Sequence, residues 1–326
     1  MDKAPGLGNI RPMTLPPAPD AIPPGARITR VACIGECMVE LGLPTNEAPR
    51  VGFAGDTFNT AVYLRRAAPD VAVSYVTALG TDPLSERMLA TFAAEELDTG
   101  LIERRADRVP GLYAITTDAA GERSFTYWRD RSAARTLFMP PARVTPAALK
   151  DFGLVYLSAI TLAILEPEAR DSLHDSLSAC RHAGGKVALD SNYRPRLWPG
   201  AALARQEMAR FWAITDIGLP SFDDEAALWG DPGPLATRAR LEAAGVTGGA
   251  VKRGPAGPLP IGWDGELPDF PAAPRVVDTT AAGDSFNGGF LAAWIAGLPP
   301  ADCLLAGHRL AAEVIGHPGA IMPRAG

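Results

Sequence analysis

The strongest constraint on the fold is an alternation of short apolar segments with helix-like segments. Arg30 to Gly35 has the composition of a buried strand, and residues 56–66 follow as a helix. Val71 to Ala78 is a second apolar strand. Asp82-Pro83 then opens a second helix, because aspartate is a good N-cap and proline suits the first helical position. This order and spacing predict a parallel β-sheet with crossover helices.

The alternation is interrupted once and then resumes. Residues 112–117 and 124–128 are β-type runs joined by the turn sequence of residues 118–121, so they predict a hairpin that stands apart as a flap. Beyond it the sequence predicts further strands, at residues 154–157, 186–189, 216–219 and 249–251, and further helices, at residues 167–182, 283–296 and 301–315. Residues 1–27 are proline-rich without apolar periodicity, which predicts an extended or disordered tail.

Composition and charge argue against several classes of protein. The net charge of −6 argues against binding to nucleic acid, since a negatively charged protein gains nothing from counterion release. No apolar run approaches the roughly 18 residues of a membrane span, and the N-terminus lacks the pattern of a secretory signal. The cysteines show no C-x-x-C spacing, which predicts reduced, mostly buried thiols in a cytoplasmic protein. The histidines are scattered, which argues against zinc.

The strongest chemical signal lies in residues 276–290, where a short predicted strand leads into a turn of small residues that opens a helix. Backbone N–H groups at such a helix start bind phosphate. The small side chains of Ala281, Ala282 and Gly283 let a phosphate approach the backbone. Asp284 follows directly and is placed to take a proton from an attacking hydroxyl. A helix N-cap is the alternative role for this aspartate.

This string resembles the C-terminal signature of the PfkB, or ribokinase-like, family of carbohydrate kinases, whose commonest form has glycine where this chain has Ala281. Residues 52–61 resemble the family's first signature, G-G-x-x-x-N-x-A. A tight turn at Gly55 would let a sugar lie against the backbone. Asp56, the expected N-cap, and Asn59 would then face the ligand from the helix start.

Residues 251–257 form a strand end and a turn with two glycines, which resembles the family's nucleotide loop. Pro258 stands where the family often has alanine or cysteine. His308 lies on the last helix, where similar proteins contact adenine, and a packed helix histidine is its alternative role. The residues that the resemblance implies for ATP are Asn192, Arg194, Lys252, Gly254, Gly257, Gly283 and His308.

Two arginines indicate an acidic sugar as the substrate. A buried carboxylate is costly unless paired, and arginine binds it through two hydrogen bonds. Arg129 ends the flap and Arg194 follows a core strand, although both could be ordinary surface arginines. These stretches, with residues 192–198, resemble the 2-keto-3-deoxygluconate kinases of the PfkB family. The substrate-binding residues implied are Gly55, Asp56, Asn59, Tyr113, Tyr127, Arg129, Arg194 and Asp284.

The resemblance covers residues 28–326. It implies a doubly wound α/β/α sandwich with a small β-sheet lid from about residues 36–54 and 109–130. The implied reaction transfers the γ-phosphoryl group of ATP, with Mg²⁺, to the terminal hydroxyl of the keto acid. Asp284 would be the general base, and the backbone of residues 281–284 would stabilise the transition-state charge. A homodimer or higher homo-oligomer is expected, because a lid sheet of this kind often pairs with the lid of another subunit.

The metal ligands and the substrate each leave an alternative. Many relatives carry an N-x-x-E motif that organises Mg²⁺ through water, whereas residues 221–225 here are Ser-Phe-Asp-Asp-Glu. Asp224 and Glu225 are therefore the metal candidates, with an acidic helix start as the alternative. A fructokinase or ribokinase activity is the second enzyme hypothesis, and a non-catalytic sugar-acid binding protein is the third. A Rossmann dehydrogenase is excluded because no G-x-G-x-x-G follows the first strand.

Overall fold

The structure is a computed structural model that describes residues 28–43, 48–117 and 123–324. The predicted tail of residues 1–27 and the predicted turn at residues 118–121 lie outside the described residues, as do residues 44–47 of the expected lid.

The larger sheet has eight strands in the described part of the chain, in the order β12-β11-β10-β9-β8-β1-β4-β5. Neighbouring strands are parallel except β12, which pairs antiparallel with β11. Their bounds are β1 Arg30–Ile34, β4 Ala72–Leu79, β5 Ile102–Arg104, β8 Leu154–Ser158, β9 Lys186–Asp190, β10 Ile217–Gly218, β11 Gly248–Val251 and β12 Leu259–Ile261. Because the strand order reverses beside β1, ligands are expected in the crevice at the carboxyl ends there.

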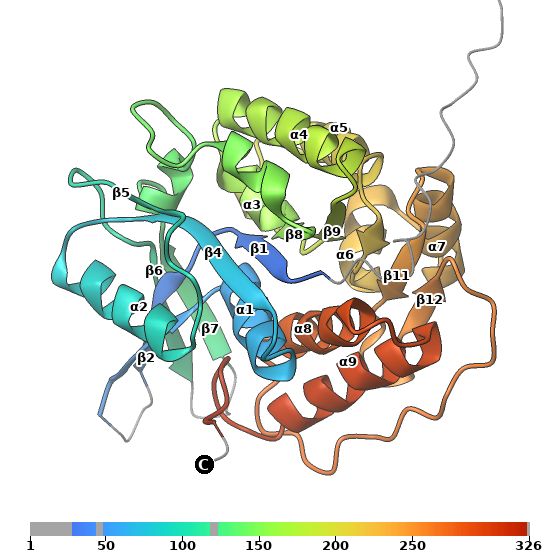
Figure 1. Ribbon diagram of the computed structural model, residues 1–326. Helices are drawn as coiled ribbons and strands as arrows, with labels where there is room; N and C mark the ends of the chain where they lie inside the picture. The colour runs from blue at the N-terminus through green and yellow to red at the C-terminus, as the bar shows by residue number, and fades with distance from the viewer. Residues whose placement is uncertain (1–27, 44–47, 118–122, 325–326) are drawn as a thin grey trace, which may run out of the picture.

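Helices cover both faces of this sheet (Figure 1). Successive strand residues point to opposite faces, so Cys33 and Tyr156 pack in one core and Ile34 and Leu157 in the other. One face carries α1 Asp56–Ala67, α2 Pro83–Ala94, α8 Ala282–Ile295 and α9 Pro300–Val314; the other carries α3 Ala159–Ile164, α4 Pro167–His182, α5 Ala201–Trp212, α6 Phe222–Trp229 and α7 Pro234–Ala243. This confirms the predicted doubly wound sandwich.

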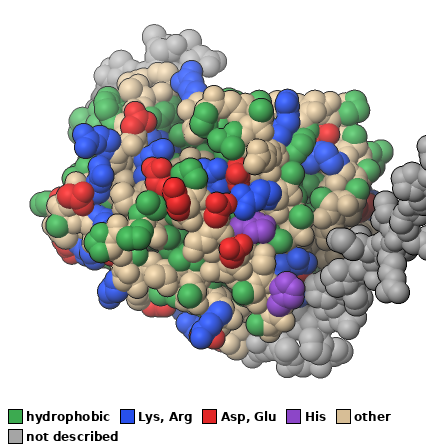
Figure 2. All heavy atoms as spheres, turned by 90° about the horizontal axis from the view of Figure 1, so that it is seen from above, with side chains coloured by type: hydrophobic (Ala, Val, Ile, Leu, Met, Phe, Trp, Pro, Cys, Tyr) green, Lys and Arg blue, Asp and Glu red, His purple; other side chains and the backbone are tan. Residues whose placement is uncertain are grey.

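Figure 2 shows acidic and basic side chains interspersed on the face that lies uppermost in Figure 1.

The small lid that the sequence predicts is a second sheet of four strands among the described residues, in the order β3-β2-β6-β7. Its strands are β2 Met38–Leu43, β3 Arg50–Ala54, β6 Leu112–Thr117 and β7 Arg123–Trp128. Tyr113 and Tyr127 are directly opposite each other on β6 and β7, with ring centroids 5.8 Å apart. The predicted hairpin strands are therefore confirmed, and they belong to the sheet that faces the carboxyl ends of the main strands (Figure 1).

Two local predictions are wrong. The N-cap of α1 is Gly55, and Asp56 is the first residue of the helix. The stretch before α8 is irregular: Val276 and Val277 are exposed, and the Val277 N–H donates to the carbonyl of Ile315 at 2.7 Å. A pair of adjacent valines has strand propensity, but here the last helical segment satisfies the backbone instead of a neighbouring strand.

Candidate active site

A cleft of about 1060 Å³ lies between the lid sheet and the carboxyl ends of the main strands. It brings together most of the site residues predicted from the sequence. Those that line it are Gly55, Asp56, Asn59, Tyr113, Tyr127, Arg129, Asn192, Arg194, Asp224, Lys252, Ala281, Ala282, Gly283 and Asp284. In the described part of the chain, four predicted residues do not line the cleft: Glu225, Gly254, Gly257 and His308.

The start of α8 forms one wall of the cleft. Its N-cap is Ala281, with a φ of 61° in the left-handed region that favours glycine. This conformation explains why a glycine commonly occupies the position in the family that the signature resembles. Asp284 is the third residue of the helix, so the alternative role of this aspartate as the N-cap is wrong. Its carboxylate is free for another task.

Neighbouring residues hold the carboxylate of Asp284 in place and change its pKa. Asn59 Nδ2, on the adjacent helix α1, donates to Asp284 Oδ2 at 2.8 Å. Burial, and after it the charge of Asp56, raise the pKa of Asp284 to about 7. A carboxylate with this pKa is a useful proton acceptor near neutral pH.

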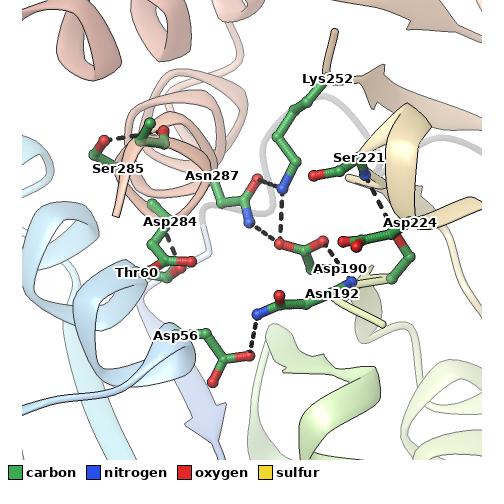
Figure 3. Close-up of polar contacts among 12 residues, drawn as sticks. Asp56, Thr60, Asp190, Asn192, Ser221, Asp224, Lys252, Asp284, Ser285 and Asn287 are labelled. Carbon is green, nitrogen blue, oxygen red and sulfur yellow. Dashed lines mark hydrogen bonds and ion pairs between the residues drawn. The ribbon is translucent and has the colours of Figure 1, made fainter. Parts of the chain in front are cut away.

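Lys252 reaches the same wall from the end of β11 (Figure 3). Its Nζ donates to Asp190 Oδ2 at 2.7 Å and to Asn287 Oδ1 at 3.1 Å. Asn287 Nδ2 in turn donates to Asp190 Oδ2 at 2.7 Å. Asp190 and Asn287 were not among the site residues predicted from the sequence. The available signals were the position of Asp190 at the carboxyl end of a predicted strand and that of Asn287 inside the signature string.

On the lid side of the cleft, two glutamates bind residues that the sequence predicted for the substrate. Arg129 Nη2 donates to Glu36 Oε2 in a buried pair, and the hydroxyl of Tyr113 donates to Glu40 Oε2. Glu36 and Glu40 were missed because nothing local in the sequence marks them as partners. Tyr127 is about half exposed at 49%. The predicted contacts of Arg129, Tyr113 and Tyr127 with a substrate remain predictions.

Two further predicted residues, Asn192 and Arg194, line the cleft from the segment after β9. Asn192 Nδ2 donates to Asp56 Oδ2 at 2.7 Å, which joins the end of β9 to the start of α1. Arg194 is exposed, and its Nη1 lies 3.2 Å from Asp224 Oδ1. Because Arg194 is exposed and lines the cleft, some of the five N–H donors of its guanidinium are accessible to a ligand.

The sequence model of pfkB family carbohydrate kinases matches residues 28–325. The chain belongs to the pfkB family. The chain is 45% identical to the 2-dehydro-3-deoxygluconokinase of Escherichia coli K12 over 303 residues, which cover 90% of this chain and 97% of that protein. It is 46% identical to the enzyme of that name from Dickeya dadantii over 301 residues, covering 90% and 96%.

A solved structure agrees with the family assignment. The aminoimidazole riboside kinase of Salmonella enterica, in complex with aminoimidazole riboside and an ATP analogue, superimposes with a TM-score of 0.76 at 26% identity. The alignment covers 89% of this chain and 95% of that one. The recognition of the family and of its ribokinase-like fold is thus confirmed. Among the described residues, no helix has the length and apolar character to span a bilayer.

The two metal candidates of this kinase point in different directions. Asp224 lines the cleft, whereas Glu225 is buried and accepts a hydrogen bond from Arg240 Nη2 at 2.5 Å. Burial raises the pKa of Glu225 to about 7 and that of Asp224 above its usual range. Within the described residues, no group of three or more His, Cys, Asp or Glu side chains could hold a metal. A lone carboxylate fits Mg²⁺, which proteins often bind through one or two carboxylates plus substrate phosphates.

The predicted nucleotide loop lies beside the last helix. Gly254 and Gly257 both have positive φ, so the turn requires glycine at these places. A Cβ on Gly257 would meet the ring of Phe270 at 2.8 Å, and this ring packs 5.2 Å from that of His308. His308 Nε2 lies 2.7 Å from the carbonyl oxygen of Pro271. The contact of His308 with adenine stays a prediction.

Proposed function

We propose that this kinase transfers the γ-phosphoryl group of ATP to the terminal hydroxyl of 2-dehydro-3-deoxygluconate, which is 2-keto-3-deoxygluconate. The product is 2-keto-3-deoxy-6-phosphogluconate. The observation that carries the proposal is a cleft with a near-neutral carboxylate and a helix N-terminus on one wall and two arginines on the others. The relatives at 45% and 46% identity bear the name of this activity.

In this mechanism Asp284 accepts the proton of the attacking hydroxyl while the new O–P bond forms and the bond to ADP breaks. Asn59 orients the carboxylate through its 2.8 Å hydrogen bond. The N–H groups of residues 281–284 and the Lys252 ammonium stabilise the charge on the transferred group. Such groups act without reorganisation, since the fold already holds them in place.

The keto acid is distinguished from a neutral sugar by its carboxylate. The positive charge of Arg129 is balanced by an ion pair with Glu36, and Arg194 is exposed beside Asp224. We assign the carboxylate to these two arginines, with Tyr113 and Tyr127 against the carbon chain. Asp56, on the floor between them, accepts hydrogen bonds from the sugar hydroxyls. The homodimer and the cytoplasmic location expected from the sequence stay predictions.

Removing the guanidinium of Arg194 tests this assignment. We expect Arg194→Ala to weaken binding of the keto acid by about 10–100-fold, because a hydrogen bond to a charged group contributes about 1.5–3 kcal/mol. Calorimetry without nucleotide isolates the substrate from the ATP contacts predicted for the same residue. Arg238→Ala is the control, since Arg238 pairs with Glu242 on α7. Equal affinity of the Arg194→Ala variant and the wild type would refute the assignment.

Mg²⁺ belongs to the proposed reaction through Asp224, which would hold it, directly or through water, together with phosphate oxygens. When bound, the ion neutralises charge on the phosphates. We expect Asp224→Asn to raise the Mg²⁺ concentration for half-maximal rate by about 10–100-fold. Asp223→Asn, on the exposed side of the same helical turn, is the control and keeps the wild-type Mg²⁺ curve. A normal curve for Asp224→Asn would remove this residue from the metal site.

The substrate is tested by ADP release from Mg²⁺-ATP with the keto acid, fructose, ribose or gluconate as acceptor. The proposal expects turnover of the keto acid far above the other three. Turnover of fructose or ribose instead would favour the fructokinase or ribokinase hypothesis. Binding of the keto acid without ADP release would favour the non-catalytic binding protein.

A further inference from the structure

The ammonium of Lys252 lies at the phosphate-binding end of α8. A Cβ built on Gly283 would be 3.4 Å from Lys252 Nζ, so the charge sits beside the first turn of the helix. That turn also carries Asp284. A lysine ammonium at this place would contact a phosphoryl group bound at the helix start.

Two buried side chains, Asp190 and Asn287, hold this ammonium by hydrogen bonds. Asp190 is 2% exposed and accepts hydrogen bonds from both Lys252 and Asn287 at 2.7 Å. Asn287 is fully buried, and its Oδ1 accepts a second hydrogen bond from Lys252 Nζ at 3.1 Å. A free lysine side chain has many rotamers, and fixing them costs conformational entropy. These two partners therefore fix the place of the charge before any ligand binds.

The same hydrogen-bond network reaches the proposed base. Asn287 Nδ2 lies 3.0 Å from the hydroxyl of Tyr156, which is 3.2 Å from Thr60 Oγ1. Thr60 Oγ1 is also 3.2 Å from the carbonyl oxygen of Asp284. Figure 3 shows Lys252, Asn287 and Asp190 on one side of this arrangement and Thr60 with Asp284 on the other. The cation and the base thus share one buried scaffold.

We propose that Asp190 and Asn287 are positioning residues that hold the Lys252 ammonium against the phosphoryl group during its transfer. The proposal rests on the kinase function proposed above and adds to it the two residues through which Lys252 acts. Asp190 takes no part in the chemistry itself. It sets the position of the ammonium relative to Asp284.

The charges around Asp284 supply a second readout. Burial and then Asp56 raise its pKa, Asp190 raises it further, and Lys252 lowers it. The groups that face Asp284 are Asp56 on α1, Asp190 on β9, Lys252 after β11, and the neutral phenols of Tyr63 and Tyr156. Neutralising Asp190 should therefore move the acidic limb of the pH–rate profile to lower pH, whereas removing Lys252 should move it to higher pH.

A double-mutant cycle of Asp190→Asn and Lys252→Met tests the proposal. We expect each single variant to lower kcat by about 10²–10³-fold, as for loss of one preorganised donor, with smaller changes in the KM for ATP. The double variant should be no slower than Lys252→Met alone. Losses that multiply would overturn the proposal, because Asp190 would then act independently of Lys252. A kcat for Asp190→Asn within about twofold of wild type would also overturn it.

A milder variant covers the case in which Asp190→Asn does not fold. Asn287→Ser keeps the charge pair and removes the amide contacts, so we expect a smaller kcat loss of about 10-fold that disappears in the Lys252→Met background. A loss that persists there would contradict the positioning role. Wild-type turnover of the keto acid tests the proposed function separately. The cycle compares variants with whichever acceptor the wild type phosphorylates, so the two ideas can fail independently.

Discussion

Replacing Asp284 by asparagine should lower kcat by about 10²–10⁴-fold, the contribution of a well-placed general base. The amide cannot accept the hydroxyl proton, yet it has the size of the carboxylate and stays within reach of Asn59. The wild-type rate should rise with pH through about 7, because the pKa of Asp284 is raised to about 7 and only the deprotonated form is active. This limb should vanish in the variant. Initial rates between pH 5.5 and about 9 measure both effects.

The control for this variant is Asp302→Asn, which removes an exposed aspartate from the first turn of α9. Both aspartates lie in the first turn of a helix, and the exposed Asp302 stabilises its helix N-terminus by about 0.3–1 kcal/mol. Only the loss at Asp284 should affect the chemical step. If Asp284→Asn retained more than about a tenth of the wild-type kcat with a normal pH profile, Asp284 would not be the base.

Replacing Glu36 by alanine should destabilise the protein by about 3–5 kcal/mol, because it leaves the Arg129 guanidinium buried without its partner. The two side chains are only 1% and 7% exposed. The pair joins the segment after β1 to the end of the lid strand β7, so its loss should also loosen the lid. Urea unfolding at neutral pH measures the free energy of unfolding.

Two further variants separate lost charge compensation from lost packing. Arg129→Met added to Glu36→Ala removes the orphaned charge and should recover a large part of the stability. Glu96→Ala breaks the surface pairs of Glu96, which is 56% exposed, with Arg65 and Arg324, and should cost less than about 1 kcal/mol. Equal destabilisation by Glu36→Ala and Glu96→Ala would show that the buried pair carries no special weight.

The fold was predictable because its signals are local. The apolar strands β1, β4, β8 and β9 and the capped helix α2 each have a pattern in adjacent residues. The error at Val276 and Val277 has the opposite origin. Their strand propensity is real, but within the described part of the chain no strand pairs with them, so tertiary context decides.

The site was predictable only in part, since some of its supporting contacts join residues that no motif connects. Asp284 and Lys252 stand in recognisable strings, and so do their partners Asn59 and Asn287, but no motif connects Asp190 to Lys252 or Glu36 to Arg129. Asp190 is 62 residues from Lys252, and Glu36 is 93 residues from Arg129. A similar limit applies to Glu225, whose orientation toward Arg240 instead of the cleft depends on how α6 packs against α7.

The most direct test of the central claim is the structure of the product made from Mg²⁺-ATP and 2-keto-3-deoxygluconate, determined by phosphorus NMR with coupling to protons. The account predicts that the wild-type enzyme forms a phosphate ester on the terminal carbon. Its phosphorus then couples to the two protons of that carbon. A phosphorus that couples to a single proton, which places the ester on a secondary hydroxyl, or ADP with free phosphate and no ester would contradict it.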